Sequence, residues 1–185
     1  MAANAKHYVN NKEFLEAIIE WKEKVKEAES SDEDIPPVSD YIGECFLKIA
    51  QHLSYKPNFI NYTFKEEMIG DGIENCLQYV NNFNPEKSKN PFAYFTQIIY
   101  YAFVRRIQKE KKQLYIKYKT MDSQSTLNDN IDTSTYDQEQ NYVFETMTQD
   151  QKANMYDFIS NFEDAKKKKK VTKKSATSLE LFMGV

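Results

Sequence analysis

The chain has 185 residues, of which 41% are apolar and 29% charged, and its formal net charge is −3. Four glycines and five prolines are few, which argues against a turn-rich β fold and favours helices. No apolar run approaches the length of a membrane span and no charged-then-apolar leader opens the chain, so we expect a soluble, intracellular protein.

Apolar residues at three- and four-residue spacing predict three helices before residue 84. The first is capped by Asn11, carries Trp21 at the edge of its apolar stripe and ends in an acidic, proline-containing loop. The second begins at about Ser39 or Asp40. The third begins near Thr63, because Glu66 three residues on completes a capping-box pattern.

Two glycines and two cysteines lie inside these helical patterns. Gly70 and Gly72 fall within the third helix, where glycine is unfavourable, and so they predict close helix packing. Cys45 and Cys76 have no metal-ligand spacing, and we expect both to be buried free thiols.

A longer helix is predicted from Asn90, a good N-cap, and Pro91, which suits the first helical position. Its apolar stripe comprises Phe95, Ile98, Ile99, Ala102, Phe103 and Ile107. Its opposite side carries Tyr94, Gln97, Tyr101, Arg105, Gln108 and Lys112.

Residues 87–119 hold nine lysines and arginines against one acid, although the chain as a whole is negative. A basic helix with aromatic side chains on its outer face can bind phosphates and stack on unpaired bases, which predicts nucleic-acid binding. The alternative is a solvated lysine face with the aromatic residues in the core.

The second half of the chain changes composition three times. Residues 120–140 are polar and predict a flexible linker, 141–164 an acidic helical segment, and 166–174 carry seven lysines without an acid. We therefore expect an all-α protein with a compact bundle of about four helices, then a linker, short acidic helices and a basic disordered tail. The predicted segments are 1–38, 39–119, 120–140, 141–164, a lysine-rich tether at 165–177 and a terminal peptide at 178–185.

No catalytic constellation is present in the sequence. His7 and His52 have no cysteine, serine or aspartate at a telling spacing, and there is no glycine-rich phosphate loop or paired-cysteine site. We therefore predict a binding protein without a cofactor or metal, and not an enzyme.

Residues 67–83 (EMIGDGIENCLQYVNNF) and 90–107 (NPFAYFTQIIYYAFVRRI) together resemble conserved region 2 of bacterial sigma factors. The likeness is strongest to the late-transcription sigma factors of large tailed, myovirus-type phages, which have a minimal region 2 and a C-terminal sliding-clamp-binding peptide. The matching positions are Glu67, Ile69, Asp71, Gly72, Leu77, Val80 and Phe83 in the first stretch and Tyr94, Thr96, Ile99, Ala102, Arg105 and Ile107 in the second. The family's tandem tryptophans fall here at Gln97 and Ile98, and its base-reading glutamine and threonine at Tyr101 and Val104.

The resemblance implies a sigma factor that acts in the host bacterial cytoplasm, binds host core RNA polymerase and melts AT-rich viral late promoters. It assigns contact with the coiled coil of the polymerase's largest subunit to Glu67, Asp71 and Leu77. It implies promoter DNA contacts at Tyr94, Gln97, Tyr100, Tyr101, Arg105, Arg106, Lys109, Lys111 and Lys112. It also implies coupling to the phage DNA sliding clamp through Leu179, Leu181 and Phe182, and a phage transcription co-activator as a further partner. The alternative is a clamp-tethered DNA-binding or replication-accessory protein without promoter specificity.

Overall fold

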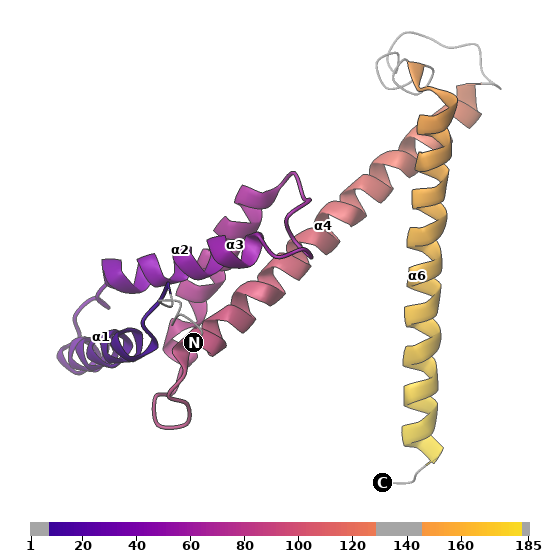
Figure 1. Cartoon of the computed structure of the whole chain (residues 1–185). Coiled ribbons are helices and arrows are strands. Elements are labelled where there is room, and N and C mark those ends of the chain that lie inside the picture. Colours follow the sequence, from indigo (N-terminus) through magenta and orange to yellow (C-terminus); the bar gives the residue numbers. More distant parts are fainter. Residues whose placement is uncertain (1–7, 129–145, 183–185) are drawn as a thin grey trace, which may run out of the picture. The chain divides into compact units, whose positions relative to one another are not determined.

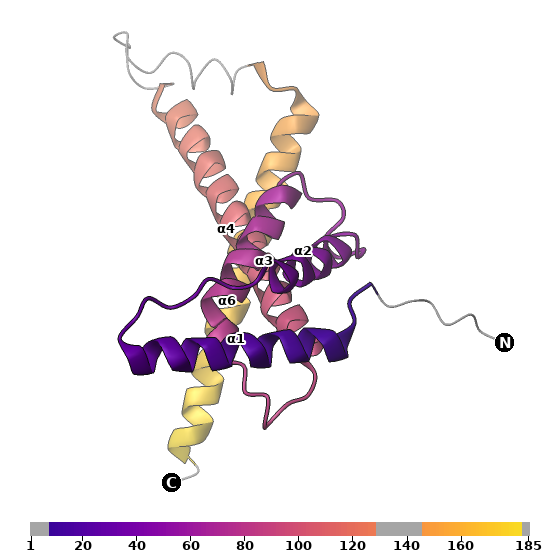
Figure 2. The ribbon, with the colours of Figure 1, turned by 90° about the vertical axis from the view of Figure 1, so that its left-hand side faces the viewer.

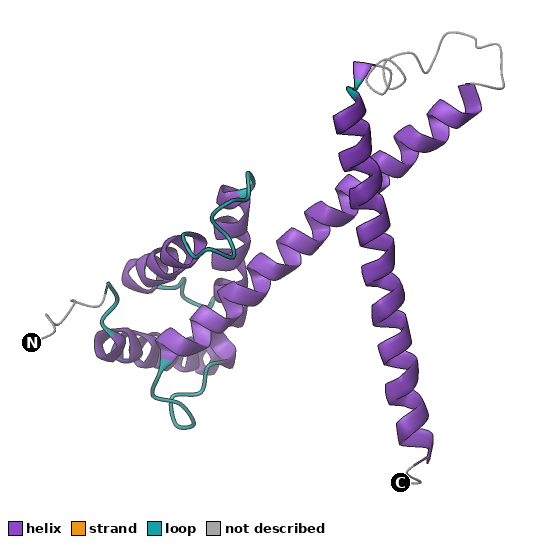
Figure 3. Ribbon diagram, turned by 45° about the vertical axis from the view of Figure 1, so that its right-hand side comes forward, coloured by secondary structure: helices purple, strands orange, loops and turns teal. Residues whose placement is uncertain are grey.

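The computed structural model of the protein describes residues 8–128 and 146–182, and the side chains of 8–123 and 146–168. Throughout these described ranges the regular elements are helices, with no strand (Figures 1 and 3), which confirms the predicted all-α class. None of the helices in the described part of the chain is both long and apolar enough to cross a membrane. The elements are α1 (Asn11–Ser31), α2 (Asp40–Ser54), α3 (Lys65–Tyr79), the short 3-10 helix η1 (Val80–Asn82), α4 (Pro91–Asn128) and α6 (Gln149–Phe182).

The chain forms two compact units, Met1–Gln108 and Lys109–Val185, which we call the N-terminal and C-terminal units. The boundary lies inside α4 and not at the predicted position after residue 119. The first helix, predicted as a separate segment, belongs to the N-terminal unit, because Phe14, Ile18 and Trp21 are buried in its core.

Four phenylalanines from different parts of the sequence form the centre of the N-terminal unit. Phe95 of α4 lies with its ring centroid 5.6 Å from that of Phe14, 4.6 Å from that of Phe46 and 6.0 Å from that of Phe83. Figure 2 shows how this comes about, since α1 runs across the first turns of α4 and the end of α3. Four residues of the predicted apolar stripe of α4, Phe95, Ile99, Ala102 and Phe103, are buried, whereas Ile98 and Ile107 are partly buried against the core.

The start of α4 agrees with the prediction, whereas the predicted caps of α1 and α3 differ from those in the structure. The Asn90 side chain accepts a hydrogen bond from Ala93 N at 3.0 Å, as expected of an N-cap. Asn10, not Asn11, caps α1, accepting from Lys12 N at 3.1 Å. Asn11 instead ties α1 to α4, because its Oδ1 accepts from Phe92 N at 3.1 Å.

The capping box predicted at Thr63 is wrong. Helix α3 begins at Lys65 with Phe64 at its N-cap, and no side chain completes a cap hydrogen bond there. Phe64 is packed against the core and against the ring of Tyr62, 5.1 Å away. Tertiary packing of this aromatic pair therefore places the helix start, in preference to the local capping pattern.

Trp21 lies in the core and not at the edge of the helix stripe. Its side chain is 5% exposed, and its Nε1 donates a hydrogen bond to Pro36 O at 3.1 Å. The buried indole thus has a partner for its one polar group, and it holds the acidic loop after α1 against that helix.

Cys45 and Cys76 are buried free thiols, as predicted. Burial raises the pKa of both thiols, which keeps them protonated and poorly nucleophilic at neutral pH.

The two glycines of α3 differ, and only one of them confirms the close packing expected. A Cβ at Gly72 would lie 3.0 Å from Ile99 Cγ2 and 3.1 Å from Phe103 Cε1, whereas a Cβ at Gly70 would have nothing within 4 Å. Gly72→Val should therefore lower the free energy of unfolding by about 1–3 kcal/mol, because the larger side chain forces α3 and α4 apart.

Gly70→Val provides the matched control for that substitution, measured in the same urea unfolding experiment. It should leave stability unchanged or raise it by a few tenths of a kcal/mol, because valine is a better helix former than glycine and meets no neighbour. Equal stability of the two valine variants would contradict this packing of α3 against α4.

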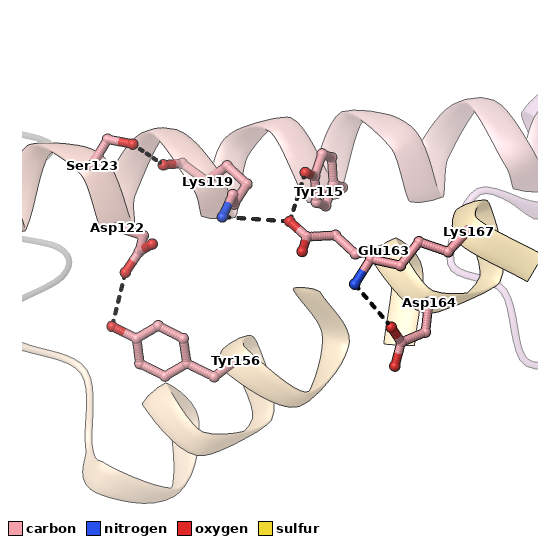
Figure 4. Close-up of polar contacts among 8 residues, drawn as sticks. All are labelled: Tyr115, Lys119, Asp122, Ser123, Tyr156, Glu163, Asp164 and Lys167. Atoms are coloured by element: carbon pink, nitrogen blue, oxygen red, sulfur yellow. Dashed lines mark hydrogen bonds and ion pairs between the residues drawn. The ribbon is translucent and has the colours of Figure 1, made fainter. Parts of the chain in front are cut away.

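The C-terminal unit pairs the second part of α4 with α6 in antiparallel directions. The rings of Tyr115 and Phe162 stack with centroids 4.5 Å apart, and Tyr118 meets Phe158 edge-on at 5.7 Å. Hydrogen bonds and ion pairs flank these rings (Figure 4), and a hydrogen bond from Tyr115 lowers the pKa of the Glu163 carboxyl. Among the described side chains of this unit, those of Met121, Met155 and Ile159 are the most buried.

The predicted linker start at residue 120 and the predicted break of α6 into short helices both differ from the structure. Helix α4 continues to Asn128, although serine, threonine and aspartate dominate its end. The reason is burial of Met121, which is 6% exposed, and a hydrogen bond between Tyr156 and Asp122 at 3.0 Å. Helix α6 runs without a break to Phe182, through the residues predicted to be a disordered tether, while 129–145 lie outside the described residues.

Candidate functional site

Two neighbouring tyrosines project from the outer face of α4 in the N-terminal unit. Tyr100 is 40% exposed and Tyr101 52% exposed, and their ring centroids lie 5.8 Å apart with the rings edge to face. Gln97, one turn before Tyr101, is also exposed. Two exposed rings on one rigid helix provide apolar surface on which flat, unpaired bases can stack.

Phe59, in the loop between α2 and α3, packs against Tyr100 of this pair. It is 3% exposed, and its ring meets Tyr100 edge-on at 5.5 Å and Phe103 edge-on at 5.2 Å. Phe59 connects the exposed pair to the core, so Tyr100 is held by a fixed neighbour. Sequence reasoning missed this role, and the only signal was a large aromatic residue two positions after Pro57, in a loop.

Tyr94 shares the predicted face but is placed differently. Its ring lies 5.2 Å from that of Phe83 and 5.0 Å from that of Phe95, so it packs against the edge of the core. Burial raises the pKa of its phenol. Tyr94 therefore offers less open ring surface than Tyr101 does.

Two residues predicted to contact different partners contact one another. The Arg106 guanidinium donates two hydrogen bonds to the Asp71 carboxylate, from Nε to Oδ2 and from Nη2 to Oδ1, each at 2.7 Å. The two side chains are only 18% and 29% exposed. This fork-to-carboxylate geometry is the strongest form of ion pair, and it joins α3 to α4.

Asn75 extends this pair into a short network that the sequence did not reveal. Its Oδ1 accepts a hydrogen bond from Arg105, and its Nδ2 donates to the backbone oxygen of Asp71 at 2.6 Å. Arg105 itself remains exposed at the helix surface. The network orients Arg105 beside the tyrosine-bearing face of α4.

The outward face of α3 contains two of the three residues predicted to bind polymerase. Glu67 is exposed and Leu77 is 45% exposed, and between them Gly70 and Glu74 are exposed on successive turns. Asp71 lies at the edge of this face, where it is turned toward α4. The face thus consists of an apolar side chain and several carboxylates around a glycine with open space above it.

The remaining predicted residues belong to the C-terminal unit. Lys109, Lys111 and Lys112 are exposed on α4. The backbone of Leu179, Leu181 and Phe182 is part of α6, and their side chains lie outside the described residues.

No protein-family model matches the chain, and no curated protein matches it significantly.

Proposed function

We propose that the protein is a minimal sigma factor of the region 2 type, which binds host core RNA polymerase through α3 and opens promoter DNA with α4. The observation that carries this proposal is the exposed pair Tyr100 and Tyr101, backed by buried Phe59 and flanked by Arg105. A site for single-stranded DNA needs exposed rings on a rigid support with cations beside them, and α4 provides the rings, the support and a cation.

The energies of such a site suit promoter opening. Stacking on an aromatic side chain contributes about 1–3 kcal/mol per base, and flipping or unpairing a base costs a few kcal/mol. Two stacked bases therefore offset most of the cost of opening a short segment, which favours AT-rich sequence because it unpairs most easily. Arg105 adds a phosphate contact that does not depend on the base.

The exposed face of α3 supports the polymerase part of the proposal. Interfaces combine apolar anchors at the centre with a polar rim, and here Leu77 is the anchor while Glu67 and Glu74 supply negative charge. The partner of such a face carries basic residues around an apolar groove, as expected of a helical coiled coil on the largest subunit. Leu179, Leu181 and Phe182 complete the proposal as the contact with a sliding clamp.

Run-off transcription with host core polymerase tests the proposal. Addition of the protein should produce transcripts from a template with an AT-rich late promoter and none from a template without it. DNA binding with no promoter-dependent transcript would instead support a clamp-tethered accessory protein.

Tyr100→Ala/Tyr101→Ala should reduce permanganate reactivity of promoter thymines by about 10-fold or more, since each stacked base is worth about 1–3 kcal/mol. Binding to core polymerase should not change, because α3 is untouched. Tyr55→Ala provides the matched control, because Tyr55 is 61% exposed and lies outside both α3 and α4. Unchanged thymine reactivity in the double variant would remove the tyrosine pair from strand opening.

A further inference from the structure

The contacts between α4 and α6 define their register in the C-terminal unit. Tyr115 is opposite Phe162, Tyr118 is opposite Phe158, and Asp122 hydrogen-bonds to Tyr156. Numbers rise along α4 as they fall along α6, so the helices are antiparallel. Figure 4 shows the hydrogen bond from Tyr156 to Asp122 together with the ion pair from Lys119 to Glu163, whose atoms are 3.4 Å apart.

It follows that residues before Tyr115 on α4 and residues after Glu163 on α6 lie at the same end of the pair. Both helices are basic there, although Lys112 and Lys166 are far apart in the sequence. We call these six exposed side chains the lysine fork: Lys109, Lys111 and Lys112 of α4, and Lys166, Lys167 and Lys168 of α6. Figure 3 shows the two helices crossing.

The positive charge of the helix pair is concentrated at the end that carries the lysine fork. Glu110 and Asp164 are the acids nearest to the fork in sequence, and Asp164 pairs with Lys167 at 3.4 Å. In the middle of the pair, Glu163 neutralises Lys119, and beyond it Asp122, Asp150 and Asp157 make the opposite end acidic. Helix α6 continues from the fork with four more lysines, at 169, 170, 173 and 174.

We propose that the lysine fork binds duplex DNA through its phosphates, independently of base sequence. Like charges on two helices repel, and a polyanion between or along them removes that repulsion while releasing its own counterions. A duplex is favoured over a single strand because residues 109–113 and 164–174 include no aromatic side chain on which a base could stack.

This site differs from the tyrosine pair of α4 in chemistry and in unit. It requires neither polymerase nor a promoter, so the proposal goes beyond the proposed function and can fail separately. A nonspecific duplex contact would hold the protein on DNA during search, as phosphate contacts do in other DNA-binding proteins.

Binding of the full chain to a short duplex of random sequence, measured at several salt concentrations, tests the fork. Lys109→Gln/Lys111→Gln/Lys112→Gln should lower the slope of log affinity against log salt by about one for each lysine that contacts a phosphate, and so by about one to three. Lys166→Gln/Lys167→Gln/Lys168→Gln should lower it by a similar amount. If either triple variant retains the full slope, its helix is not part of the site.

A second experiment tests whether the two lysine sets act together. Ile159→Asp places a charge in the buried contact between α4 and α6 but retains every lysine, and it should reduce duplex affinity and salt slope as strongly as a triple variant does. Ser160→Asp adds the same charge at the adjacent exposed position and should bind nearly as the wild type. Equal binding by these two variants would overturn the fork, since the lysines would then act as separate charges.

Further controls identify the ligand and guard against misfolding. Tyr115→Ala weakens the same helix pair more mildly, by removing the stack on Phe162, and should reduce affinity in the same direction as Ile159→Asp. Tyr55→Ala, which removes an exposed ring from the N-terminal unit, should leave duplex binding unchanged. Polyglutamate should bind more weakly than the duplex, and equal binding of polyglutamate would overturn the assignment to DNA.

Discussion

Phe95→Ala should lower the free energy of unfolding by about 3–5 kcal/mol, a large part of the total stability of a small helical domain. Phe95 is fully buried, and its ring contacts those of Phe14, Phe46 and Phe83, which come from α1, α2 and the segment after η1. Alanine leaves a cavity at the point where these elements meet. Urea unfolding followed by circular dichroism measures the loss.

The control for this substitution is Tyr101→Ala, which removes an aromatic ring from the opposite face of the same helix. Tyr101 is half exposed, so its loss should change stability by no more than about 0.5 kcal/mol. A Phe95→Ala protein as stable as the Tyr101→Ala protein would show that the aromatic cluster is not the centre of the core.

Asp71→Lys should lower the free energy of unfolding by about 2–4 kcal/mol, because it replaces the partner of a largely buried arginine by a like charge. Arg106 donates both of its 2.7 Å hydrogen bonds to Asp71, and each side chain is less than one third exposed. A double-mutant cycle with Asp71→Ala and Arg106→Ala measures the coupling, which should be about 1–3 kcal/mol for a hydrogen-bonded charge pair.

This pairing changes how polymerase binding should be tested. If Asp71→Lys abolished co-purification with core polymerase, the cause could be either the loss of a polymerase contact or the loss of stability. Glu67→Lys reverses a charge on the same helix, one turn earlier and fully on the outward face, without touching the pair. It should retain wild-type stability and lose polymerase binding. Wild-type co-purification of Glu67→Lys would remove the outward face of α3 from the polymerase contact.

Arg106 is also less suited than Arg105 to a DNA phosphate contact. The Asp71 carboxylate already accepts two hydrogen bonds from the Arg106 guanidinium, so a phosphate would have to compete with a bidentate partner. The Arg106 side chain therefore stabilises the contact between the two helices that carry the proposed polymerase and DNA faces. Arg105, oriented by Asn75, is the cation next to the tyrosine pair.

The sequence by itself determined the features that depend on local geometry. Asn90 and Pro91 mark the start of α4 because a cap and a fixed φ act within one turn. The buried stripe of α4 followed from its 3.6-residue period, and the same period predicted the buried sides of α1, α2 and α3. The exposure of Tyr101 was predicted in the same way, because it lies opposite that stripe.

Only the tertiary structure decided which long-range contacts form. Phe59 comes from a loop, where no periodicity indicates a neighbour, and the pairing of Asp71 with Arg106 joins residues 35 positions apart. The polar composition after residue 119 predicted a linker, yet burial of Met121 in the helix pair extends α4 to Asn128. Weak local propensities are overridden where burial between distant segments contributes more free energy than they cost, and a single sequence does not reveal which segments will meet.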